Sequence, residues 1–237
     1  MRFHLIPVAI AIYAGAFVGY LNAQTPPPSA DQIVATMHGR DAAREAASGG
    51  YVGRREYTLE NQQFHKRADM LVNITCDGNG MKHFDVLAED GWKSANQRVL
   101  RQMMETESDR SRPEIRAKSR ITSENYSFRM LETGPVEDRM AYVIEAIPKR
   151  DDEALFHGRI WVDTEDYALV RVEGEPAKNP SFWTRKVHFV QQYHKSGTFW
   201  FPLSTTSMTN ARIFGTTDVT IRYFDYKPSG RRSVASR

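Results

Sequence analysis

The sequence of 237 residues contains a single cysteine, Cys76, and its charges almost cancel. One cysteine excludes a disulfide within the chain, so the fold has to be stabilised by its own apolar core. The 32 Lys and Arg residues stand against 29 Asp and Glu residues, which leaves a net charge of +3. This excess is too small to indicate nucleic-acid binding, and we expect no nucleic-acid partner.

The motifs that usually carry enzyme chemistry are also missing. The sequence has no Gly-x-Ser-x-Gly elbow and no His-Glu-x-x-His pair. Cys76 lies in an apolar strand pattern and not at a turn where a thiolate would be stabilised. His188 and His194 share a predicted strand face, but the usual strand rise separates them by about 20 Å. We therefore predict a protein that is not an enzyme and that has no metal and no cofactor.

The longest apolar run lies at the N-terminus. A short cationic start precedes the apolar residues 5–18, and small residues follow up to Ala23. This order predicts a secretory signal peptide over residues 1–23 and, after its removal, a periplasmic protein that is not integral to a membrane. A membrane anchor is the alternative, but the run is shorter than the roughly 20 residues that a spanning helix needs. Residues 24–29 form a stiff, proline-rich spacer.

After the spacer, the apolar residues first follow the period of a helix. Ile33, Val34 and Met37 recur at three- and four-residue intervals. This spacing predicts an amphipathic helix over residues 30–47, capped near Ser29 and ended by the glycine pair that follows.

From residue 51 onward the period changes to two, which is typical of strands with one buried face. The glycine-rich residues 77–80 predict a hairpin turn, and residues 93–120 break the pattern as a helical insertion that we place over the concave face of the sheet. We expect strands near residues 51–60, 67–76, 84–88, 126–133, 138–148, 154–164, 167–175, 184–194, 199–209 and 217–226. Because the connections are short, neighbouring strands must be antiparallel. The sequence thus predicts an α+β protein with a large antiparallel sheet, one domain over residues 30–226 and a basic, flexible tail over residues 227–237.

The predicted strands carry more apolar side chains than two modest helices readily cover. For any single residue a place in an ordinary core is the simpler explanation, but together they favour a partly open cavity for lipid. Burying a chain of about fifteen methylenes there is worth on the order of 12 kcal/mol at roughly 0.8 kcal/mol each. The candidate ligand-lining residues are the apolar ones on these faces and in the insertion: Met70, Val72, Ile74, Phe84, Val86, Met103, Met104, Tyr142, Ile144, Ile160, Val162, Val170, Val172, Phe189, Phe201, Leu203 and Ile221.

Several segments resemble the LolA/LolB/RseB-type periplasmic proteins, the group that includes outer-membrane lipoprotein-sorting proteins. The segments are the hairpin from Gly158 to Pro176 with its Trp-x-Asp sequence, Ser181-Phe182-Trp183, Phe199-Trp200-Phe201-Pro202 and the closing residues 221–226. The resemblance implies a large curved sheet that forms an unclosed half β-barrel, with the N-terminal helix and the helical insertion on its concave face. It also implies a hydrophobic cavity for acyl chains or a lipoprotein, and no cofactor.

Four functions remain open at this point. The first is a periplasmic carrier for lipid or lipoprotein acyl chains. The second is a sensor or scaffold that binds another envelope protein through the same groove, with aromatic anchors such as Phe182, Trp183 and Trp200. The third is an integral outer-membrane barrel, which the predicted helices and the polar C-terminal tail disfavour. A hydrolase is the least supported, and the sequence does not indicate an oligomeric state.

Overall fold

A computed structural model describes residues 27–179, 184–211 and 215–230. The predicted signal peptide over residues 1–23, the aromatic pair at 182–183 and most of the predicted tail lie outside these described residues. Within the described part, no helix has both the length and the apolar character needed to cross a membrane.

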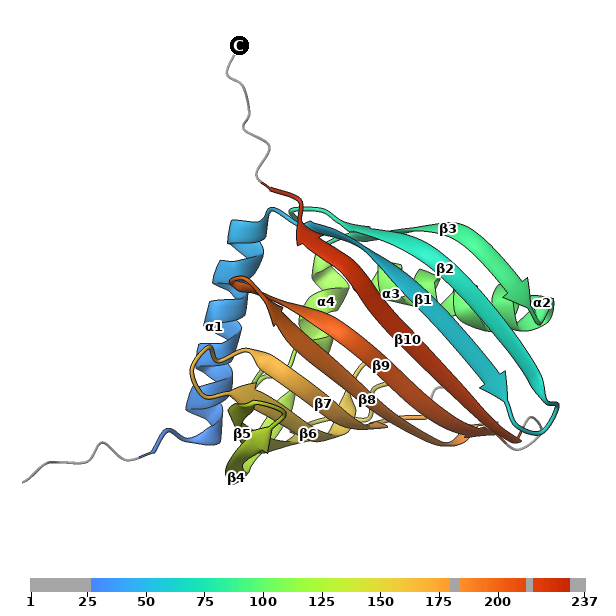
Figure 1. Cartoon of the computed structure of the whole chain (residues 1–237). Helices are drawn as coiled ribbons and strands as arrows, with labels where there is room; N and C mark the ends of the chain where they lie inside the picture. Colours follow the sequence, from blue (N-terminus) through green and yellow to red (C-terminus); the bar gives the residue numbers. More distant parts are fainter. Residues whose placement is uncertain (1–26, 180–183, 212–214, 231–237) are drawn as a thin grey trace, which may run out of the picture.

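Ten strands form one antiparallel sheet in the order β3-β2-β1-β10-β9-β8-β7-β6-β5-β4 (Figure 1). Their bounds are β1 Tyr51–Asn61, β2 Lys66–Cys76, β3 Lys82–Gly91, β4 Tyr126–Val136, β5 Arg139–Pro148, β6 Phe156–Asp163, β7 Leu169–Pro176, β8 Thr184–Ser196, β9 Phe199–Ala211 and β10 Gly215–Pro228. Only the pairing of β1 with β10 joins distant parts of the chain, with Tyr57 opposite Ile221. β3 and β4 are the two edges, so the sheet stays unclosed, and the predicted α+β half-barrel is confirmed.

The helices are α1 Ala30–Ser48, α2 Lys93–Ala95, the π-helical turn η1 Asn96–Leu100, α3 Arg101–Arg110 and α4 Pro113–Ser119. α1 packs on β4 and β6, whereas η1 packs on β2 and α3 on β3, which places the insertion on the concave side as predicted. Local chemistry sets the ends of α1. The Ser29 hydroxyl accepts a hydrogen bond from the backbone N–H of Gln32, whose side chain accepts one from the N–H of Ser29, and Gly49 ends the helix at φ 63°.

The interior is divided into two hydrophobic clusters. The first lies between α1 and strands β4–β8 and includes Ile33, Ile144 and Ile160. The second lies between η1–α3 and strands β1, β2, β3 and β10 and includes Tyr57 and Leu100. Each helical segment therefore covers one end of the concave face.

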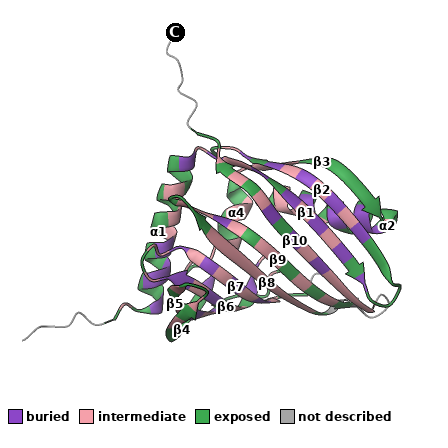
Figure 2. Ribbon diagram, in the orientation of Figure 1, coloured by how far each residue is buried: buried purple, intermediate pink, exposed green. Residues whose placement is uncertain are grey.

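The strands between these clusters are less covered. Purple bands recur along β1 and β2 in Figure 2, whereas β8 is pink along most of its length. Among the described side chains of β8 and β9, only Phe201 is buried. In the described part of the chain, the helices therefore cover the middle of the concave face less closely than its two ends.

Candidate functional site

Most of the candidate ligand-lining residues pack in the two clusters. Tyr142, Ile144, Ile160, Val162, Val172 and Phe189 belong to the first cluster or pack against it, and Met70, Val72, Phe84, Val86, Met103, Met104 and Ile221 do the same in the second. The structure therefore brings them together as two cores and not as one continuous lining. Their contact with a ligand stays a prediction.

Four candidates lie in neither cluster. Ile74, Val170 and Phe201 are buried elsewhere, and Leu203 is 40% exposed. Val170 and Leu203 both lie at register shifts, where one strand has an extra residue that its neighbour does not pair. Such a shift interrupts the regular alternation of inward and outward side chains along a strand. As a result, Leu169 packs against the first cluster, although alternation with Val172 had predicted Val170 there.

The middle of the concave face is more polar than predicted. Thr205 pairs with Ile221 and Ser207 with Val219, and directly opposed residues share a face. Both partners on β10 belong to the second cluster, so the two hydroxyls also face inward. Thr205 and Tyr223 share a hydrogen bond of 2.9 Å between their oxygens. Thr205 and Ser207 therefore form a hydroxyl stripe on β9 that separates the two apolar clusters.

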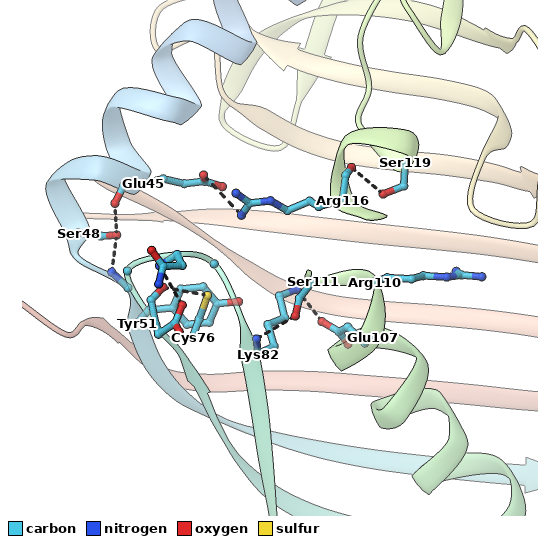
Figure 3. A pocket seen from close by; sticks show the side chains of 15 residues that line it. Glu45, Ser48, Tyr51, Cys76, Lys82, Glu107, Arg110, Ser111, Arg116 and Ser119 are labelled. Carbon is cyan, nitrogen blue, oxygen red and sulfur yellow. Dashed lines mark hydrogen bonds and ion pairs between the residues drawn. The ribbon is translucent and has the colours of Figure 1, made fainter. Parts of the chain in front are cut away.

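A cavity of about 360 Å³ opens where the end of α1 meets the β2–β3 turn and helices α3 and α4 (Figure 3). We call it the charged cavity. Its lining includes the following residues: Glu45, Ser48, Tyr51, Cys76, Asp77, Gly80, Lys82, Glu107, Arg110, Ser111, Arg116 and Ser119. No sequence pattern indicated this cavity, because its charged residues come from α1, the β2–β3 turn, β3, α3 and α4.

One carboxylate in the charged cavity binds two cations. Glu107 accepts hydrogen bonds from Arg55 at 2.6 and 3.0 Å and from Lys82 Nζ at 2.7 Å. The Arg55 side chain is 3% exposed, and its guanidinium also contacts the ring of Tyr223, 4.8 Å from the centroid. Burial alone would raise the pKa of Glu107, but Lys82 and Arg55 outweigh this effect and lower the pKa well below its usual range. Glu107 is therefore ionised at neutral pH.

Arg116 extends from α4 into the same cavity. Its Nη1 lies 3.8 Å from Glu45 Oε2 on α1, across the opening (Figure 3). Its guanidinium also lies against Gly80, where a Cβ would clash with Nη1. Gly80 has φ +85°, a conformation that glycine adopts without strain and that the hairpin turn requires. The Nε atom of Arg116 is buried and has no hydrogen-bond partner among the described residues.

A second hollow of about 240 Å³ continues from the charged cavity along α1. We call it the aromatic groove. It shares Glu45, Ser48 and Tyr51 with the charged cavity, and its other lining residues are Asp41, Arg44, Leu169, Tyr193, Phe199, Trp200 and Phe201. The rings of Tyr51 and Phe201 lie 6.1 Å apart, and Trp200 Nε1 donates to Asp166 at 3.1 Å. An amphipathic surface therefore runs from the less covered strands to the charged cavity.

The described residues contain no cluster of three or more His, Cys, Asp or Glu side chains that could hold a metal ion. Cys76 is buried in the wall of the charged cavity, as a core residue of β2. Burial raises the pKa of its thiol, which disfavours the reactive thiolate.

Comparisons with known proteins concern the fold. A family model described as a family of unknown function (DUF5686) matches residues 119–226. A search of curated proteins finds no match. Among solved structures, the chain is similar to a domain described as an outer membrane lipoprotein-sorting protein from Vibrio parahaemolyticus, with 16% identity, 84% of this chain and 92% of that chain covered, and a TM-score of 0.42.

Two further solved structures are similar. One is a DUF1329 family protein from Desulfovibrio piger, with 10% identity, 89% and 96% coverage of the two chains and a TM-score of 0.46. The other is a LolA superfamily protein from Nitrosomonas europaea, with 11% identity, 85% and 94% coverage and a TM-score of 0.36. The group that the sequence resembles is therefore represented among the matches.

Proposed function

We propose that this chain is an exported periplasmic binding protein that holds an acyl chain of a lipid or lipoprotein. The acyl chain would lie in the aromatic groove, and the polar part of the ligand would face the charged cavity. The observation that supports this proposal is the less covered middle of the concave face, where β8 and β9 have a single buried side chain among their described residues. Ligand pockets are typically lined by apolar and aromatic side chains with a few polar groups that orient the ligand.

The size of the two hollows suits part of an acyl chain. They measure about 240 and 360 Å³ and share three lining residues, so a flexible chain can pass from one to the other. Burying about eight methylenes there contributes on the order of 6 kcal/mol at roughly 0.8 kcal/mol each. Part of this gain is lost because binding restricts the ligand. We therefore expect dissociation constants of roughly 0.1 to 1 mM for simple fatty acids.

Native mass spectrometry of the exported chain, purified without detergent, tests the proposal. We expect a bound lipid or acyl species on the wild-type protein and its loss in a Phe199→Asp variant, because the new carboxylate lies in the aromatic groove. The matched control is Leu87→Asp, which places the same charge on edge strand β3 at a side chain that is 50% exposed. The control should keep the ligand.

Two outcomes count against the acyl-binding proposal. One is a wild-type protein without bound lipid that also fails to bind a fluorescent fatty acid. The other is a stoichiometric envelope protein in place of lipid, which would favour the sensor or scaffold function.

A further inference from the structure

The charged cavity has more hydrogen-bond donors than acceptors to match them. Arg55, Lys82 and Arg116 are three cations, and the carboxylates that pair with them are Glu45 and Glu107. Asp77 also lines the cavity, but its Oδ1 accepts hydrogen bonds from the backbone N–H groups of residues 79 and 81 and closes the hairpin turn. Arg110 extends away from Arg116 (Figure 3). Asp77 keeps its negative charge, so Arg55, Lys82, Arg110 and Arg116 are four cations beside the three carboxylates Glu45, Asp77 and Glu107, and one positive charge is in excess.

Lys82 and Arg116 both have N–H donors that Glu45 and Glu107 leave unused. Arg55 already binds both oxygens of Glu107, so the ammonium of Lys82 shares an oxygen that another donor also uses. Only one hydrogen bond from its three N–H groups is seen among the described residues. Arg116 makes a single long ion pair at 3.8 Å, and its buried Nε has no acceptor. Because that Nε is inaccessible to solvent, an incoming anion would bind the terminal guanidinium nitrogens, whose ion pair with Glu45 is long.

The β2–β3 turn brings Arg116 close to the start of β3. Because Gly80 has no Cβ, the guanidinium of Arg116 can lie against this turn, which leads into Lys82. Both cationic side chains line the charged cavity, and neither lines the aromatic groove. A ligand with an apolar tail in the groove would thus carry its head group to these two cations.

We propose that the charged cavity binds the acidic head group, a carboxylate or a phosphate, of an anionic amphiphile, with Arg116 and Lys82 as its donors. This inference rests on the proposed function, because the aromatic groove supplies the site for the tail. It narrows the ligand class from acyl chains in general to acyl or alkyl chains with an acidic group. Glu45 competes with the head group for Arg116, and so it limits the affinity.

Displacement of the uncharged dye N-phenyl-1-naphthylamine from the exported chain tests the inference. The competitors are dodecanoate, dodecyl phosphate and methyl dodecanoate, below their micelle concentrations. We expect the acids to bind roughly tenfold more tightly than the ester, because hydrogen bonds to charged groups are the stronger ones. The tighter of the two acids identifies the preferred head group.

Variants separate the head-group site from the tail site. Arg116→Gln should reduce the preference for acid over ester to about twofold and leave the affinity for the ester unchanged. The control Arg112→Gln, a change of the same kind at a side chain that is 52% exposed, should keep the full preference. Glu45→Gln should strengthen acid binding by about two- to threefold, because it removes the competing carboxylate.

The two proposals fail in different ways. Equal affinity for acid and ester in the wild-type protein, or a preference that survives Arg116→Gln, overturns the head-group site and leaves the acyl-binding function standing. Displacement by none of the three competitors overturns both proposals, since the head-group site requires the tail in the groove.

Discussion

Replacing Glu107 by glutamine removes the negative charge that holds Arg55 and Lys82 together. Arg55 keeps neutral acceptors in the hydroxyls of Tyr57 and Tyr226 and in the amide oxygen of the new glutamine, but its guanidinium stays buried without a counter-charge. Breaking a buried ion pair by removing one partner costs about 3–5 kcal/mol. The Glu107 side chain is 32% exposed and partly screened by water, so we expect a smaller cost than that range, about 2–3 kcal/mol. For a domain of this size the loss lowers Tm by roughly 5–10 °C.

Urea unfolding followed by circular dichroism measures this difference. Glu105→Gln is the matched control, because Glu105 is exposed on the same helix, and we expect a change within about 0.5 kcal/mol. The pKa of Glu107 is lower in the folded protein than its ordinary value of 4.5 in the unfolded chain. Its stabilising effect is therefore present above about pH 4.5 and is lost as the pH falls toward the folded-state pKa. The difference in unfolding free energy between wild type and Glu107→Gln should narrow below about pH 4.5. A difference at neutral pH no larger than that of the Glu105→Gln control would refute the reasoning.

Three further predictions concern stability and export. Gly39→Ala should stabilise the protein by about 0.5–1 kcal/mol in urea unfolding, because Gly39 lies exposed within α1 with open space where a Cβ would be; a loss of stability would contradict the packing of α1. Asp163→Asn should cost about 2–3 kcal/mol in the same assay, because this buried carboxylate accepts hydrogen bonds from Arg139 and from the backbone N–H groups of residues 165 and 166. Intact-mass measurement of the exported chain should show an N-terminus near Gln24, and retention of residues 1–23 would contradict the signal-peptide prediction.

Local patterns predicted most of the fold because they report interactions between near neighbours. The spacing of Ile33, Val34 and Met37 gave α1 to within one residue, and the glycine-rich turn after Cys76 gave the hairpin of β2 and β3. The short connections in the second half of the sequence predicted the antiparallel order of β4–β10, which is confirmed. These features depend on periodicity and turn chemistry, both of which are visible in a single sequence.

Register shifts were not visible in the same way. Leu203 alternates with Phe201 in the sequence, but the extra residue between the pairs Gln192–Ser204 and Tyr193–Pro202 ends that alternation. The hydroxyl residues 204–207 that follow Leu203 could have indicated a polar inner face, because consecutive hydroxyl residues must occupy both faces of β9. It indicates a strand whose inner face is not part of a continuous apolar lining.

The charged cavity could not be predicted because its contacts are long-range. Glu107 and Arg55 are 52 positions apart, and Glu107 and Lys82 are 25 apart. Lys82 and Glu107, taken alone, fit solvated positions at a strand and a helix surface. Arg55 alternates with Tyr57 and Leu59 on the buried face of β1, which was a usable signal for a buried cation. Its partner Glu107 follows only from the packing of α3 over β3.

Quenching of tryptophan fluorescence by a brominated fatty acid tests the acyl-binding account most directly. The measurement compares a variant whose only tryptophan is Trp200, in the aromatic groove, with one whose only tryptophan is Trp161. Trp161 alternates with two residues of the first cluster and therefore points to the convex face. The account predicts saturable quenching of Trp200 and none of Trp161. Equal quenching of both, or quenching of neither, would contradict it.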